Sequence, residues 1–226
     1  MELHSYLSGS GGPPLRVLTV AGVLDSAAEQ WPDKDALVVV DQGIRWSWSE
    51  LRDRSRALAA GLLAAGLNPG DRVGMLASNR AEWLMAQFGT AYAGLILVNI
   101  NPAYRMPELE YALNKVGCRG LITETQFKTS DYVGMLQTLA PELKTATPGD
   151  LHAKRLPELR LIVHLGEGWT PGMHRLTGAA KDVFQYGDVN HAAVSATGDA
   201  ILASNFRGQY IGRQCIVVNH VLTKCF

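Results

Sequence analysis

Residues 89–113 join a helix end, a strand and a helix start in immediate succession, and they constrain the fold more than any other segment. Gly94 follows a helical pattern, and because glycine lacks a Cβ it can adopt the left-handed conformation that closes a helix. The apolar run at residues 95–98 then predicts a buried strand. Pro107 lies where the first turn of a helix tolerates a missing N–H. The inward stripe of this second helix is predicted to contain Leu109, Ala112, Leu113 and Val116.

Local signals also define the elements that precede this segment. Thr19 is placed to cap a helix that reaches Trp31. Residues 36–40 and 44–46 have the pattern of a hairpin, with a turn assisted by Gly43.

Two capping-box spacings predict where the next helices begin. Ser47 and Glu50 have the Ser-x-x-Glu spacing, which predicts a long helix closed by Gly66. Asn79 and Glu82 repeat that spacing, so we expect a second capped helix there. The buried stripe of the first helix is predicted to contain Leu51, Leu58, Leu62 and Ala65.

Strand and helix patterns alternate along the chain. Strands are predicted at residues 72–77, 119–123 and 159–165, with a helix near residues 130–139. Such alternation is typical of α/β proteins, so we expect a layered α/β/α fold with a mostly parallel sheet.

Composition divides the chain into three parts. Residues 1–16 form a flexible leader rich in Ser, Gly and Pro, and residues 17–176 carry the α/β pattern. From about Thr177 the charged residues thin out and helical periodicity is lost, so residues 177–226 form an atypical, divergent tail.

Charge and cysteine content exclude several classes of protein. The chain has 226 residues, with 21 basic and 21 acidic side chains, and therefore no net field to attract nucleic acid or anionic membrane. Its apolar runs are too short to span a bilayer. Three cysteines make no disulfide framework, and the leader lacks the pattern of a signal or transit peptide. We therefore expect a cytoplasmic protein.

Several motifs together resemble those of a known family. They are Arg45-Trp-Ser-Trp-Ser-Glu-Leu51, Asn68-Pro-Gly-Asp-Arg-Val73, Asn79-Arg-Ala-Glu-Trp83, Asn101-Pro-Ala-Tyr104, Lys115-Val-Gly-Cys118 and Phe127-Lys-Thr-Ser130. In this order and spacing the chain resembles the N-terminal part of AMP-forming acyl-CoA synthetases, which are adenylate-forming enzymes, and most closely their medium-chain branch. The resemblance implies that a full-length enzyme uses ATP and Mg²⁺ to adenylate a fatty acid, then transfers the acyl group to coenzyme A.

The phosphate-binding loop of that family has no counterpart in this sequence. The nearest segment, residues 199–208, offers only Ser204, Arg207 and Gly208 in place of a run of small residues. We therefore assign no catalytic residue, and expect no cofactor for this chain alone.

One weaker likeness to the family lies in the tail. Two short segments, Thr197-Gly198-Asp199 and Gly212-Arg213, resemble family elements. In the family these elements bind the ribose and form the hinge of the C-terminal domain. Asp199 is thus a candidate ribose ligand by resemblance, and a chance match is the competing interpretation.

The tail also carries two thiols and an imidazole spaced like part of a zinc knuckle, at Cys215, His220 and Cys225. A fourth ligand near Gly212 is missing, so no metal site is assigned.

Other polar and aromatic residues have simpler explanations than catalysis. His164 is interpreted as a strand-end histidine, whereas His152 and His174 are expected to be exposed. Glu108 and Glu110 fit the positive end of a helix dipole. We expect packing roles for Trp46, Trp48 and Trp83, and a solvated helix face for Arg52, Arg54 and Arg56.

The sequence leaves three functions to consider. The first is an N-terminal fragment of an ATP-dependent fatty acyl-CoA ligase that is inactive by itself. The second is a non-catalytic truncated protein, without function or acting as an interaction partner, which could self-associate through an uncovered sheet edge. The third, a dinucleotide-binding module, lacks the Gly-x-Gly-x-x-Gly turn.

Overall fold

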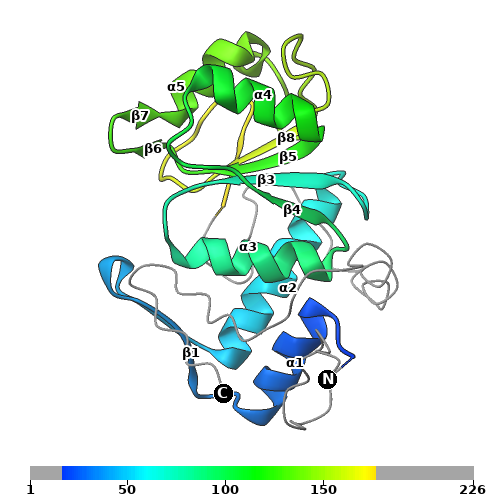
Figure 1. The fold of residues 1–226 in the computed structure, drawn as a ribbon, viewed down its shortest axis with the longest axis vertical. Coiled ribbons are helices and arrows are strands. Elements are labelled where there is room, and N and C mark those ends of the chain that lie inside the picture. The colour runs from blue at the N-terminus through cyan, green and yellow to red at the C-terminus, as the bar shows by residue number, and fades with distance from the viewer. Residues whose placement is uncertain (1–16, 177–226) are drawn as a thin grey trace, which may run out of the picture.

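The computed structural model describes residues 17–176, whose centre is a five-stranded sheet (Figure 1). The strand order is β4-β3-β5-β8-β9, and every neighbouring pair is parallel. The strands are β3 (Arg72–Leu76), β4 (Ile96–Asn99), β5 (Cys118–Thr123), β8 (Leu161–His164) and β9 (His174–Arg175).

Helices cover both faces of this sheet, as Figure 1 shows. The helices α2 (Trp48–Ala64) and α3 (Ala81–Tyr92) pack on one face, and α1 (Val20–Gln30) packs against both of them. The opposite face is covered by α4 (Met106–Val116) and α5 (Tyr132–Leu139). The predicted layered α/β/α fold is therefore confirmed.

Alternate side chains of each strand serve two separate cores, because successive residues of a strand point to opposite faces. In β3, Val73 and Met75 join the core under α2 and α3, whereas Leu76 joins the core under α4 and α5. Gly74 lies between them, and a Cβ there would come within 2.8 Å of Ile100 Cδ1 and 3.0 Å of Leu121 Cδ1. Ile100, which follows β4, and Leu121 of β5 can pack over this position because the residue is glycine.

The N-terminal elements agree with their local signals. Thr19 caps α1, its hydroxyl accepting from the Gly22 N–H at 2.9 Å. Strands β1 (Asp35–Val39) and β2 (Ile44–Ser47) form the expected antiparallel hairpin. Between them lie a short 3-10 turn, η1 (Val40–Gln42), and Gly43 in the left-handed region at φ 63°.

The expected solvated arginine face of α2 is only partly correct. Arg56 donates to Asp25 of α1 at 2.8 Å, and the Tyr92 hydroxyl of α3 donates to the same carboxylate at 2.6 Å. Arg54 lies over the Trp46 ring, 4.7 Å from its centroid. The Asp25 contacts join α1, α2 and α3, and the Arg54 contact joins α2 to β2. The sequence of α2 alone does not show these contacts.

One predicted capping box is confirmed and the other is wrong. The Ser47 hydroxyl accepts from the Glu50 N–H at 3.2 Å, and the Glu50 carboxylate accepts from the Ser47 N–H at 2.8 Å. Asn79 does not cap α3, because the N-cap is Arg80. The Ala81 N–H instead donates to the side chain of Gln42 at 2.7 Å. A partner so distant in sequence leaves no trace in local spacing.

The segment around Gly94 folds as predicted, except that its strand is not buried. Gly94 has φ 66° after the end of α3, and Pro107 lies in the first turn of α4. Strand β4 forms an edge of the described sheet, and 43% of Ile96 is exposed. Val116 is likewise 38% exposed and does not belong to the buried stripe of α4. An apolar run cannot by itself distinguish an edge strand from a central one.

Several short elements were not predicted, because they are too short for periodicity to detect. They are the hairpin β6 (Gln126–Phe127) and β7 (Ser130–Asp131), the 3-10 turn η2 (Pro141–Lys144) and strand β9.

The two capping-box motifs allow a matched stability test. We expect Ser47→Ala to lower the free energy of unfolding by about 1 kcal/mol, because a helix start loses its hydroxyl acceptor. Asn79→Ala, which removes no hydrogen bond from α3, should change it by less than about 0.5 kcal/mol. Urea unfolding followed by circular dichroism measures both, and equal losses would contradict this assignment of the caps.

Candidate functional site

The carboxyl ends of parallel strands are where α/β proteins usually present ligand contacts, so this edge of the sheet is a candidate site. Leu76 of β3 is in register with Thr123 of β5, which brings the next residues of both strands together. The Ser78 N–H donates to the Glu124 carboxylate at 2.7 Å, and the Ser78 hydroxyl donates to it at 2.9 Å. The edge therefore holds one carboxylate that is already bound by neighbouring protein groups.

Arg80 links this carboxylate to a second one. Its guanidinium donates to Glu124 at 2.9 Å and to Glu82 at 2.7 Å, and Gln42 donates to Glu82 at 3.1 Å. Burial opposes the charge of Arg80, but the two carboxylates outweigh it and raise its pKa. Burial likewise opposes the charge of Glu82, but Arg80 and Gln42 outweigh it and lower the pKa of that carboxyl.

This cluster of Gln42, Ser78, Arg80, Glu82 and Glu124, here called the carboxyl-edge brace, ties the β1–β2 turn, the start of α3 and the end of β5 together. The pKa of Glu82 is lowered and that of Arg80 is raised, so neither of these two groups is poised to exchange a proton near neutral pH. No local spacing in the sequence indicates this brace, although Ser78 and Glu124 each follow a strand of the same sheet.

His164 ends β8 and is 1% exposed, in agreement with its interpretation as a strand-end histidine. Its Nδ1 accepts from the Gly166 N–H at 3.3 Å, so in the neutral ring the proton lies on Nε2. Within residues 17–176, Nε2 has no hydrogen-bond partner. Burial, and to a lesser extent the charge of Arg175, lowers the pKa of His164.

The other two histidines of this region differ from each other. His152 is exposed, as predicted, and contacts Asp150 at 2.9 Å. His174 was also expected to be exposed, but it lies half-buried in β9. Burial lowers the pKa of its imidazole, partly offset by a hydrogen bond to the backbone at Pro148. The expectation failed because β9 was not predicted.

The remaining aromatic and acidic candidates have structural roles. Trp46 is buried, and Trp48 and Trp83 pack against the same core, as expected. Glu108 accepts from the Arg105 N–H at 3.2 Å at the start of α4, whereas Glu110 pairs with Arg155 at 2.6 Å.

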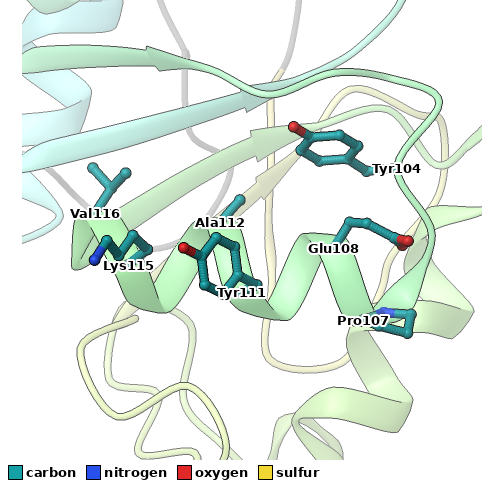
Figure 2. A pocket seen from close by; sticks show the side chains of 7 residues that line it. All are labelled: Tyr104, Pro107, Glu108, Tyr111, Ala112, Lys115 and Val116. Atoms are coloured by element: carbon teal, nitrogen blue, oxygen red, sulfur yellow. The ribbon is translucent and has the colours of Figure 1, made fainter.

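A groove lies along the outer side of α4 (Figure 2). Its volume is about 420 Å³, and its wall is mostly apolar. The lining residues are Tyr104, Pro107, Glu108, Tyr111, Ala112, Lys115 and Val116.

The sequence-predicted tail sites cannot be placed in this geometry. Asp199, its neighbours Thr197 and Gly198, and Gly212-Arg213 lie outside the described residues, as do Cys215, His220 and Cys225. Among residues 17–176, no group of three or more His, Cys, Asp or Glu side chains could hold a metal ion. In the same range, no helix is long and apolar enough to cross a membrane. Cys118 is a free, buried thiol, and burial raises its pKa to about 11.

Residues 24–176 match the family described as AMP-binding enzyme. The chain belongs to the AMP-binding enzyme family. Its parallel sheet is thus the sheet of an adenylate-forming domain, as the sequence motifs indicated.

The relatives of this AMP-binding enzyme reported below are named as acyl-CoA ligases. It is 43% identical over 187 residues to the mitochondrial medium-chain acyl-CoA ligase ACSF2 of Danio rerio, covering 83% of this chain and 30% of that protein. It is 45% identical over 159 residues to the Bos taurus protein of the same name, covering 70% and 26%. The chain therefore spans less than a third of the length of these relatives.

A solved structure gives the same fold. The crystal structure described as a long-chain-fatty-acid CoA ligase of Rhodopseudomonas palustris CGA009 has a TM-score of 0.55 and 25% identity. The match covers 68% of this chain and 34% of that chain.

The carboxyl-edge brace can be tested by removing one charge. We expect Glu124→Gln to lower the free energy of unfolding by about 1–2 kcal/mol, because Arg80 loses one of two ionic partners in a partly buried setting. Glu167→Gln, at an exposed position of the loop after β8, is the control, and should cost less than about 0.5 kcal/mol. A loss at Glu124 no larger than the control would show that the brace contributes little.

Burial of His164 predicts a pH dependence of stability. The pKa of His164 is lowered in the folded state from its ordinary value of 6.5, so the unfolded chain takes up a proton that the folded chain resists. Stability should therefore be fully present above pH 6.5 and fall as the pH drops below it. His164→Gln should flatten this fall, measured by urea unfolding at stepped pH, with His152→Gln as the control. An unchanged slope in His164→Gln would contradict the assignment.

Proposed function

We propose that this chain is the N-terminal part of an ATP-dependent fatty acyl-CoA ligase, and that residues 17–176 act as scaffold for the domain. The main support for this proposal is that the chain spans only 30% of the length of the Danio rerio relative and 26% of the Bos taurus one. In the full-length family the substrates are a fatty acid, ATP and coenzyme A, with Mg²⁺ assisting adenylation. The names of the relatives favour a medium-chain acyl group.

The described residues do not fit the phosphates of ATP. The basic group at the carboxyl edge, Arg80, is already held by Glu82 and Glu124, so an added anion would face two carboxylates. The groove along α4 is mostly apolar, and its lining includes one carboxylate, Glu108, and one ammonium, Lys115. We therefore derive no catalytic step for this chain, and propose that it is inactive by itself.

Two sequence-based assignments stay predictions. Asp199 is proposed as a ribose contact by resemblance alone. A cytosolic location is proposed from the low cysteine content, whereas the word mitochondrial in the names of the relatives applies to those proteins.

The competing function is a non-catalytic truncated protein that acts by association. It is favoured by β4, which forms an edge of the described sheet with Ile96 exposed. An edge strand offers unpaired backbone groups to another strand, so it can promote self-association.

An activity assay tests the scaffold proposal. We expect no release of AMP or pyrophosphate when the purified chain is incubated with ATP, Mg²⁺, a medium-chain fatty acid and coenzyme A. A full-length acyl-CoA ligase in the same assay is the positive control. Turnover by this chain within about a hundredfold of the control would overturn the proposal, because enzymes lacking a phosphate-binding group lose that factor or more.

A further inference from the structure

Helix α4 has three sides, and the described residues cover only two of them. Leu109 and Leu113 face inward and are fully or almost fully buried. A second side is fixed by Arg155, which pairs with Glu110 at 2.6 Å and whose carbonyl accepts from the Asn114 amide at 2.9 Å. The third side carries the groove, and the part of the chain that the structure describes leaves it open (Figure 2).

This third side combines apolar area with an exposed aromatic ring. Tyr111 is 67% exposed, and Val116 at the end of the same helix is 38% exposed. Tyr104 lies across the groove from α4, so a ring entering it would meet apolar atoms on both walls (Figure 2). Exposed aromatic and apolar residues that gather around a groove are typical of protein contact surfaces.

The charges on this side have a self-complementary order. Glu108, Tyr111 and Lys115 follow one another along the open face of α4, which places opposite charges at its two ends. Lys115 lies seven positions after Glu108, about 10.5 Å along the helix axis. Within residues 17–176 neither side chain has an ion-pair partner, and the Glu108 carboxylate accepts only a backbone N–H.

We propose that this face of α4 is a docking surface for a second copy of this chain. A two-fold axis through the helix near Tyr111 would place the two α4 helices antiparallel. Glu108 of each copy would then meet Lys115 of the other, forming two equivalent ion pairs. The two Tyr111 rings would pack near the axis, and each would enter the groove of the other copy.

A second copy fits this surface better than a partner of uniform charge. A strongly acidic or basic partner would pair with one end of the face and be repelled at the other. The two-fold arrangement instead satisfies both ends at once and uses the same residues on each side. One helix of 11 residues contributes a small area, so we expect a weak, concentration-dependent dimer with a dissociation constant of about 10 µM or higher.

This inference goes beyond the proposed scaffold role and does not rest on catalysis. It places self-association at α4, whereas the competing function places it at the edge strand β4. The activity assay can therefore refute the scaffold role, and the association measurements can refute the docking surface, independently of each other.

Charge exchange tests the pairing directly. The full chain would be measured by sedimentation equilibrium from about 1 to about 200 µM, the range of weak complexes. The wild type should form dimers. Glu108→Lys and Lys115→Glu should each raise the dissociation constant about tenfold, because each places like charges together twice in the dimer. The double exchange Glu108→Lys with Lys115→Glu should restore dimers to within about threefold of the wild type.

Two controls separate this effect from folding and from net charge. Glu108→Lys also removes an acceptor at the start of α4, but the double exchange shares that loss and should still dimerise. Glu29→Lys makes the same charge change at an exposed position of α1 and should leave association unchanged. Thermal melts of all variants verify the fold.

Three results would overturn the proposal. The first is a wild-type chain that stays monomeric over the whole range. The second is a dimer that both single reversals leave intact, or that the double exchange fails to restore. The third is a dimer broken by Ile96→Lys but not by either reversal, which would place the contact at strand β4.

Discussion

The rest of the structure depends on the parallel pairing of β3 with a strand on each side. Residues of β3 are in register with β4 along one edge and with β5 along the other. Its backbone N–H and C=O groups therefore form hydrogen bonds within the sheet in place of hydrogen bonds to water. That pairing fixes which side chains reach each helix layer, and it leaves so little room that position 74 carries no side chain. The same register brings Ser78 beside Glu124 and thereby forms the carboxyl-edge brace.

Features encoded within a few residues were predicted correctly from the sequence. Thr19, the Ser47–Glu50 pair, Gly94 and Pro107 each act on backbone groups close to them in the chain. Features that depend on distant partners were missed. Gln42 caps α3 from 39 residues away, and Glu124 receives the Ser78 N–H from 46 residues away. No local spacing encodes such pairs, and burial of a strand such as β4 likewise depends on its neighbours.

The candidate site illustrates the same limit. Resemblance to acyl-CoA synthetases identified the family, but the polar groups at the carboxyl edge satisfy one another. A group whose hydrogen bonds are already made has little free energy to gain from a ligand. The side of α4 along the groove is the opposite case, because its ring and charges have few contacts within the described residues.

The order of the strands bears on how such a sheet can assemble as the chain is synthesised. Strand β3 comes first, β4 adds to one side of it, and β5, β8 and β9 then add in turn on the other side. After β4, each new strand therefore finds its neighbour already in place, and none has to insert between two paired strands. Folding can follow translation, with each strand docking onto the growing edge as it leaves the ribosome.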